Sequence, residues 1–137
     1  PQLGVPLPTD RVAAYGTIME MSLPRGTVTL VSYETGDASI YLSTGGGIIG
    51  GGGHEAVRSA AKKLVSSGGA LIAKLKAAID HPEPTKGKVI FYVLTNNGVF
   101  RSDEMLEDDL GRNRSEFSSL FYAGQDVITQ LRLISPP

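Results

Sequence analysis

The feature that most constrains the fold of this chain is a run of glycines between a strand-like stretch and a helix-like stretch. Seven of the nine residues from Gly45 to Gly53 are glycine. Ordering a glycine costs roughly 0.5–1 kcal/mol more than ordering an alanine in regular structure. The run must therefore serve unusual backbone angles, a close backbone approach or mobility. We expect either a ligand-binding loop or a tightly bent connection between two elements.

The binding hypothesis rests on the spacing of these glycines. Gly45-x-Gly47-x-x-Gly50 has the pattern of a dinucleotide-binding loop, in which backbone N–H groups at a helix N-terminus hold phosphate. His54 follows directly and would bind an anion or transfer a proton near neutral pH. The candidate ligand-binding residues are Gly45, Gly46, Gly47, Gly50, Gly51, Gly52, Gly53 and His54.

Two departures from the pattern favour the structural interpretation of the same residues. A dinucleotide site needs a second parallel strand with an acidic residue about 20 residues further on, and here the helical pattern is still running at that distance. No Lys-Ser or Lys-Thr pair follows the glycines, so the phosphate-loop signature is also incomplete. A bent connection, or a strand that another backbone crosses closely, explains the glycines without a ligand. His54 is then an exposed residue of the first helical turn.

Two hairpins and a long helix are predicted around this run. Residues 27–33 and 38–44 are strand-like and enclose a turn with a glycine. After the run, apolar residues and Gly68 step by four and three on one face, which predicts a single helix of roughly 39 Å from Glu55 to Asp80. Residues 88–95 form the strongest strand pattern, and Asn97-Gly98 predicts a hairpin to residues 99–102.

The two ends of the chain each allow alternatives. Residues 1–8 carry three prolines and predict an extended arm. A helix capped by Thr9 and ending near Leu23 is expected next, with a strand over residues 15–21 as the alternative. Ser115 is expected to cap a last helix that carries Gly124 on its inward face, while residues 127–133 also alternate as a strand would.

The predicted order is α-β-β-α-β-β-α, which indicates an α+β fold in one domain over residues 1–137. Hairpins give antiparallel pairs, so we expect an antiparallel sheet of four or five strands packed against the long central helix and the C-terminal helix. This order is similar to that of roadblock, longin and profilin-like domains. The similarity covers most of the chain as topology, without a motif specific to those families, and topology alone does not give a function.

Composition excludes several classes of protein. The 13 basic and 14 acidic residues give a net charge of −1, so nothing favours nucleic-acid binding. No apolar run reaches the roughly 18 residues that span a bilayer, and no signal peptide is visible, so a cytoplasmic location is expected. The chain has no cysteine, which excludes disulfides, thiolate metal sites and cysteine nucleophiles.

No metal or cofactor is expected from the remaining candidates. His54 and His81 stand at opposite ends of the predicted helix, about 40 Å apart. The acidic stretch lacks the spacing of a calcium loop and is interpreted as a solvated turn partly neutralised by arginines. Its members are Asp103, Glu104, Glu107, Asp108 and Asp109.

The sequence therefore predicts a small non-catalytic interaction or regulatory module. We expect a homodimer, formed through a sheet edge or a helix face, or a complex with another protein. The alternative is a small-molecule, nucleotide or phosphate-binding protein, with or without catalysis, that uses the Gly45–Gly53 loop at a helix N-terminus.

Overall fold

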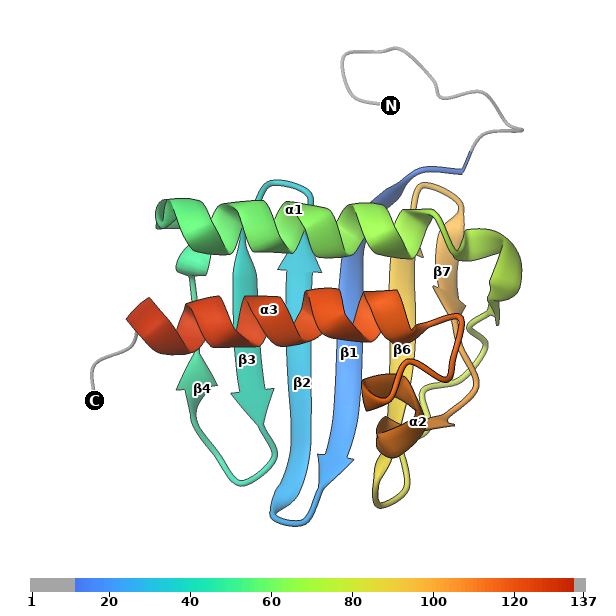
Figure 1. The fold of residues 1–137 in the computed structure, drawn as a ribbon. Helices are drawn as coiled ribbons and strands as arrows, with labels where there is room; N and C mark the ends of the chain where they lie inside the picture. The colour runs from blue at the N-terminus through green and yellow to red at the C-terminus, as the bar shows by residue number, and fades with distance from the viewer. Residues whose placement is uncertain (1–11, 135–137) are drawn as a thin grey trace.

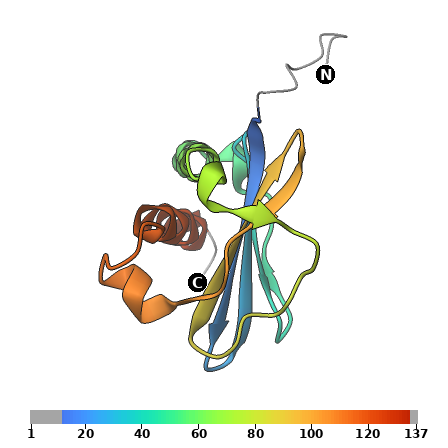
Figure 2. The same cartoon turned by 90° about the vertical axis from the view of Figure 1, so that its right-hand side faces the viewer.

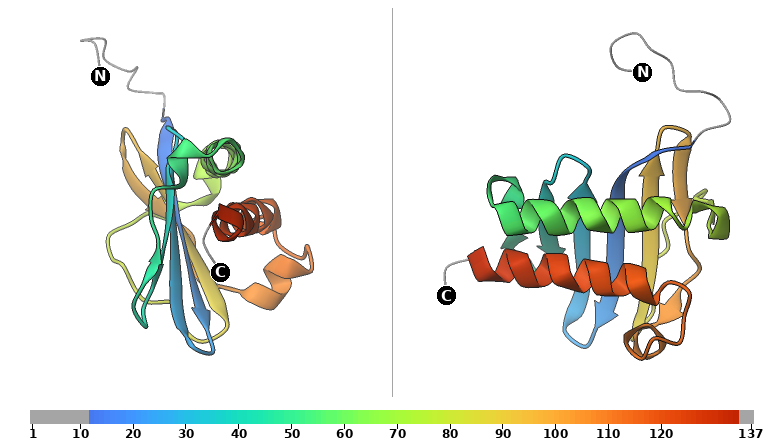
Figure 3. Two further views of the ribbon diagram at one scale, coloured as in Figure 1. Left: turned by 90° about the vertical axis from the view of Figure 1, so that its left-hand side faces the viewer. Right: turned by 45° about the horizontal axis from the view of Figure 1, so that its top comes forward.

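The computed structural model describes residues 12–134, which form a single antiparallel sheet with two long helices on one face (Figures 1 and 3). The strands are β1 (Ala14–Leu23), β2 (Gly26–Tyr33), β3 (Ala38–Leu42), β4 (Gly47–Ile48), β5 (Lys76–Ala77), β6 (Lys88–Thr95), β7 (Gly98–Arg101) and β8 (Met105–Leu106). The helices are α1 (Glu55–Gly69), α2 (Glu107–Gly111) and α3 (Ser118–Ile134), with 3₁₀ turns η2 (Gly51–Gly53) and η3 (Ile72–Lys74). The order in the sheet is β4-β3-β2-β1-β6-β7-β5, and β8 pairs with β6. The predicted antiparallel α+β class is confirmed.

The first element of the predicted α-β-β-α-β-β-α order is wrong, because residues 14–23 form a strand and not a helix. β1 lies at the centre of the sheet, with β2 on one side and β6 on the other. Its alternate residues Thr17, Met19 and Met21 are buried beneath the helices. Hydrogen bonding to two neighbouring strands outweighs the three-and-four spacing of apolar residues that suggested a helix. The predicted Thr9 cap and the arm over residues 1–8 lie outside the described residues.

The two hairpins are confirmed. β2 and β3 pair around a turn in which Gly36 has a φ of +97°, and β6 and β7 pair around Asn96-Asn97-Gly98. Residues 89–93 of β6 are buried throughout, as expected for a strand covered on both faces. The face that carries α1 and α3 is called the helix face below, and the opposite face of the sheet is called the open face.

The prediction of a single helix from Glu55 to Asp80 is wrong beyond Gly69. α1 ends there, Ala70 is its C-cap, and the chain continues through η3 into the edge strand β5. Gly68 nevertheless lies inward, as predicted. A Cβ at this position would lie 2.8 Å from Thr17 Cγ2 and 3.2 Å from Val93 Cγ2, so the glycine allows α1 to pack closely on β1 and β6.

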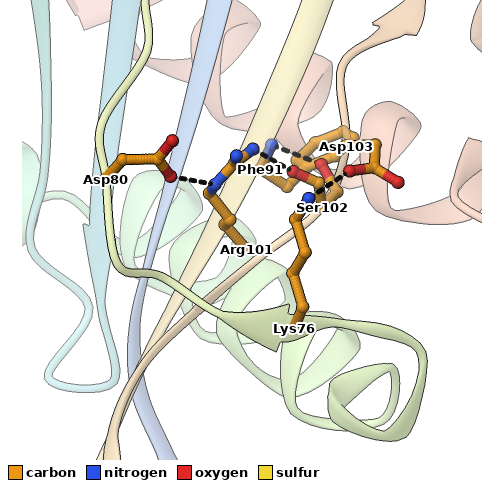
Figure 4. Close-up of polar contacts among 6 residues, drawn as sticks. All are labelled: Lys76, Asp80, Phe91, Arg101, Ser102 and Asp103. Carbon is orange, nitrogen blue, oxygen red and sulfur yellow. Dashed lines mark hydrogen bonds and ion pairs between the residues drawn. The ribbon is translucent and has the colours of Figure 1, made fainter.

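Residues 78–87, called the strap below, turn onto the open face and cover β6 from that side (Figure 2). Its first part is held by the nearly buried Arg101, whose Nε donates to Asp80 Oδ1 at 3.0 Å and whose Nη1 donates to Ser102 O at 2.9 Å (Figure 4). Its last part is held by Thr85, whose N–H and hydroxyl both donate to the Glu104 carboxylate. The strap explains why β6 is buried on both faces although the helices lie on only one.

The predicted C-terminal helix is confirmed as α3, so the alternative strand over residues 127–133 is wrong. The hydroxyl of Ser115 accepts the N–H of Phe117 at 3.0 Å and organises the turn before the helix. Gly124 lies inward, and a Cβ there would lie 2.7 Å from the Met19 sulfur and terminal methyl. The acidic stretch over residues 103–109 spans β8 and the start of α2.

Candidate functional site

The structure divides the glycine run between two places. Gly45 and Gly46 form the turn between β3 and β4, and the Gly45 N–H is already used by Leu42 O at 2.9 Å. Gly47 lies in β4 and passes so close to β3 that a Cβ would lie 2.0 Å from Ile40 O. The first three glycines therefore serve a turn and a close backbone crossing at one end of the sheet (Figure 1).

The last three glycines form η2, which leads into α1 at the other end of β4. A Cβ on Gly52 would lie 1.9 Å from Asp37 Oδ1, so a carboxylate lies against this turn. Arg58 donates to Gly52 O at 2.9 Å and forms an ion pair with Glu55. His54 is exposed, and its side chain does not cap α1. The carboxylates of Asp37 and Glu55 and the guanidinium of Arg58 thus surround this turn, and phosphate binding at the loop stays a prediction.

The strap brings His81 onto Tyr92, where the two rings stack with centroids 5.2 Å apart. This placement corrects the expectation that His81 ends the α1 helix. The Tyr92 hydroxyl is buried without a hydrogen-bond partner, and burial raises its pKa above the usual value. Burial also raises the pKa of Glu20, the neighbour of Tyr92 on the open face, and Glu83 of the strap adds to that effect. Within residues 12–134, no group of three or more His, Asp or Glu is placed to hold a metal ion.

An apolar surface lies on the part of the open face that the strap leaves uncovered. Strand register places Ile18 beside Val31, and Gly16 between Tyr33 and Leu94. A Cβ at Gly16 would lie 2.9 Å from Leu94 Cδ1 and 3.2 Å from Tyr33 Cδ1, so these two side chains meet over the glycine. The open-face patch consists of Ile18, Val31, Tyr33, Tyr41, Leu94 and Val99. Tyr33 and Tyr41 are 41% and 46% exposed, so part of each ring is open to contact with a partner.

A groove of about 310 Å³ lies on the helix face, beside α3 and over the strand ends that neither long helix covers (Figure 1). Its floor is apolar and includes Met21, Leu23, Val28, Leu42 and Ile48. We call it the α3 groove.

Polar groups of the α3 groove lie on its walls. α3 contributes Gln125, Thr129 and Arg132, and α2 contributes Glu107. The amide of Gln125 donates to Met21 Sδ at 3.4 Å, a weak acceptor. The groove therefore combines an apolar floor with hydrogen-bond donors along one wall.

Comparisons with protein-family models, curated proteins and solved structures gave no match. None of the helices in residues 12–134 has the length and hydrophobicity needed to cross a bilayer.

Both surfaces were missed from the sequence. Apolar and polar residues alternate in β2 and β3, which indicates one buried face of the hairpin. The alternation gives no role to the opposite face. The open-face patch needs the pairing of β1 with β2 and β6, which the expected first helix concealed. The α3 groove depends on where α3 crosses the sheet, and periodicity within α3 carries no information on that.

Proposed function

We propose that this protein is a non-catalytic interaction module that forms a homodimer through the open-face patch. The observation that carries the proposal is an apolar surface with two half-exposed tyrosines, built across five strands and covered by neither long helix. Aromatic side chains are enriched at protein interfaces, and a patch on a sheet is preorganised for contact. A chain without cysteine suits the reducing cytoplasm, which is the compartment we propose.

The sheet edges are poorer surfaces for self-association than the open face. The strands at the two ends of the sheet, β4 and β5, have two residues each. Strands this short offer few free backbone groups, which is how proteins protect sheet edges from pairing. A face-to-face arrangement instead packs two sheets about 10 Å apart, as in a β-sandwich.

The overall charge of the chain does not oppose the association of two copies. The net charge of −1 is near zero, a condition that promotes association. A twofold axis through the patch would place Val31 and Tyr33 of one protomer against the same region of its partner, because such interfaces are self-complementary. A second copy is therefore the occupant that we propose for this face.

Light scattering over a micromolar concentration range tests the proposal. The wild type should give about twice the 14.5 kDa mass of one chain. Tyr33→Lys and Val31→Lys each place a cation in the interface and should return the mass to that of the monomer. Leu133→Lys is the matched control, because Leu133 is 72% exposed at the end of α3, away from the open face.

Circular dichroism of each variant shows whether the fold is kept, so that loss of the dimer is separated from unfolding. A wild-type mass of 14.5 kDa throughout the range would remove the homodimer. A dimer that survives both open-face lysines and dissociates with Leu133→Lys would place the interface elsewhere.

A further inference from the structure

We propose that the α3 groove binds a medium-chain acyl carboxylate, an unbranched apolar chain of about eight to ten carbons ending in a carboxylate group. This inference does not depend on the proposed dimer, because the groove lies on the helix face and the open-face patch lies on the other. It rests on the composition of the floor, the size of the groove and the charges at its two ends.

The floor of the groove is built from the ends of four strands. Met21 and Leu23 come from β1, Val28 from β2, Leu42 from β3 and Ile48 from β4. Leu42 is 40% exposed, so apolar area remains in contact with water when the groove has no ligand. Covering this area with a hydrocarbon chain is favourable at about 25 cal/mol per Å².

The volume limits the ligand. The groove measures about 310 Å³. It lies at the lower end of the range of about 300–1,000 Å³ for small-molecule sites. A medium-chain acyl carboxylate suits a site of this size, whereas a bulkier ligand would extend into solvent.

The donors along α3 favour an anionic head group. Gln125, Thr129 and Arg132 follow one another at spacings of four and three, so they share one face of the helix, which borders the groove. Within residues 12–134, no carboxylate forms an ion pair with Arg132. Its guanidinium can therefore take a carboxylate of the ligand, and the hydroxyl and amide offer further hydrogen bonds.

Glu107 determines the orientation of the ligand. It lies on α2, beneath the start of α3, whereas Arg132 lies in the last turn of α3 (Figure 1). An anionic head is repelled at the α2 end and attracted at the Arg132 end. An extended peptide fits less well, because its backbone needs hydrogen-bond partners along its whole length and the floor offers apolar side chains.

Titration of the ¹⁵N-labelled protein with decanoate and with decanol, followed by NMR, tests the proposal. Decanoate should shift the amide resonances of Leu23, Val28, Leu42 and Thr129 and bind more tightly than decanol. Arg132→Gln should weaken decanoate binding about two- to fivefold, the range expected of a partly exposed ion pair, and leave decanol binding unchanged. Glu107→Gln should keep or strengthen decanoate binding.

Lys62→Gln is the matched control, since Lys62 is an exposed cation on α1 away from the groove. It should bind decanoate as the wild type does. Equal affinities for decanoate and decanol in the wild type would overturn the assigned role of Arg132. Shifts confined to residues outside the groove, or an apolar peptide that binds there while decanoate does not, would overturn the site or its ligand class.

Discussion

Replacing Gly68 by alanine tests how α1 packs on the sheet. The added methyl group would lie 2.8 Å from Thr17 Cγ2, 3.2 Å from Val93 Cγ2 and 3.8 Å from Leu120 Cδ1. Thr17 and Val93 are β-branched residues of neighbouring central strands, and their χ1 angles are stiff. The sheet cannot give way locally, so we expect α1 to move outward or to lose contacts.

Two terms determine the size of the effect. Overpacking a close-packed core costs about 1–3 kcal/mol. Alanine regains up to about 1 kcal/mol of helix propensity, and less in the last turn of α1 where Gly68 lies. The net loss in the free energy of unfolding should be about 0.5–2 kcal/mol. Gly68→Leu adds more volume at the same point and should cost more.

Gly124→Ala is the matched comparison within the same fold. Its methyl group would lie 2.7 Å from the sulfur and terminal methyl of Met19, the flexible end of an adaptable side chain. Alanine has a higher helix propensity than glycine in the middle of α3, and this gain offsets most of the clash with Met19. The free energy of unfolding should therefore change by less than about 1 kcal/mol. Urea denaturation followed by far-ultraviolet circular dichroism measures both variants. If Gly68→Ala is as stable as the wild type, the close approach of α1 to β1 is refuted.

Four further substitutions have expected outcomes in the same assay. Burial raises the pKa of Glu20 above 4.5, so the folded state binds this proton more readily than the unfolded state and loses stability as pH rises through the folded pKa. Glu20→Gln should therefore be more stable than the wild type at pH 7, with a difference that shrinks as pH falls through the folded pKa and is gone below about pH 4.5. Tyr92→Phe removes a buried hydroxyl without a partner and should leave stability unchanged or raise it by up to about 1 kcal/mol. Gly47→Ala should cost about 1–3 kcal/mol, because its Cβ would lie 2.0 Å from Ile40 O, whereas Gly46→Ala meets no atom within 4 Å and should cost less.

Local signals in the sequence were sufficient for some elements. The continuous apolar run from Val89 to Leu94 and the Asn97-Gly98 turn identify β6 and its hairpin, because both depend on neighbouring residues alone. The stripe through Phe117 and Leu131 predicts α3, although the alternation over residues 127–133 also allowed a strand. The antiparallel α+β class follows from these elements.

The errors occur where distant parts of the chain decide the structure. β1 is a strand because β2 and β6 pair with it on both sides, a context that its own spacing of apolar residues does not contain. α1 ends at Gly69 because residues 76–77 pair with β7 and the strap then turns onto the open face. Apolar residues keep the helical spacing of three and four from residue 71 to residue 78, so the sequence gives no sign that the helix ends at Gly69.

The candidate surfaces were hidden for a related reason. The glycine run indicated special backbone geometry correctly, since Gly47 passes close to β3 and Gly45 turns with a φ of +105°. The glycine run did not indicate whether these residues form a ligand-binding loop or a tightly bent connection. The open-face patch and the α3 groove are each assembled from several strands, and their members are ordinary apolar residues within their own segments.

Self-association through the open face is the central claim, and a distance between protomers tests it most directly. The chain has no cysteine, so a single spin label can be attached at Ser39→Cys, beside Val31 on the open face, or at Leu133→Cys, at the end of α3. Pulsed dipolar spectroscopy should give a short distance between protomers for the label at position 39 and a longer one for the label at position 133. No dipolar coupling at either position, or the shorter distance at position 133, would contradict the open-face dimer.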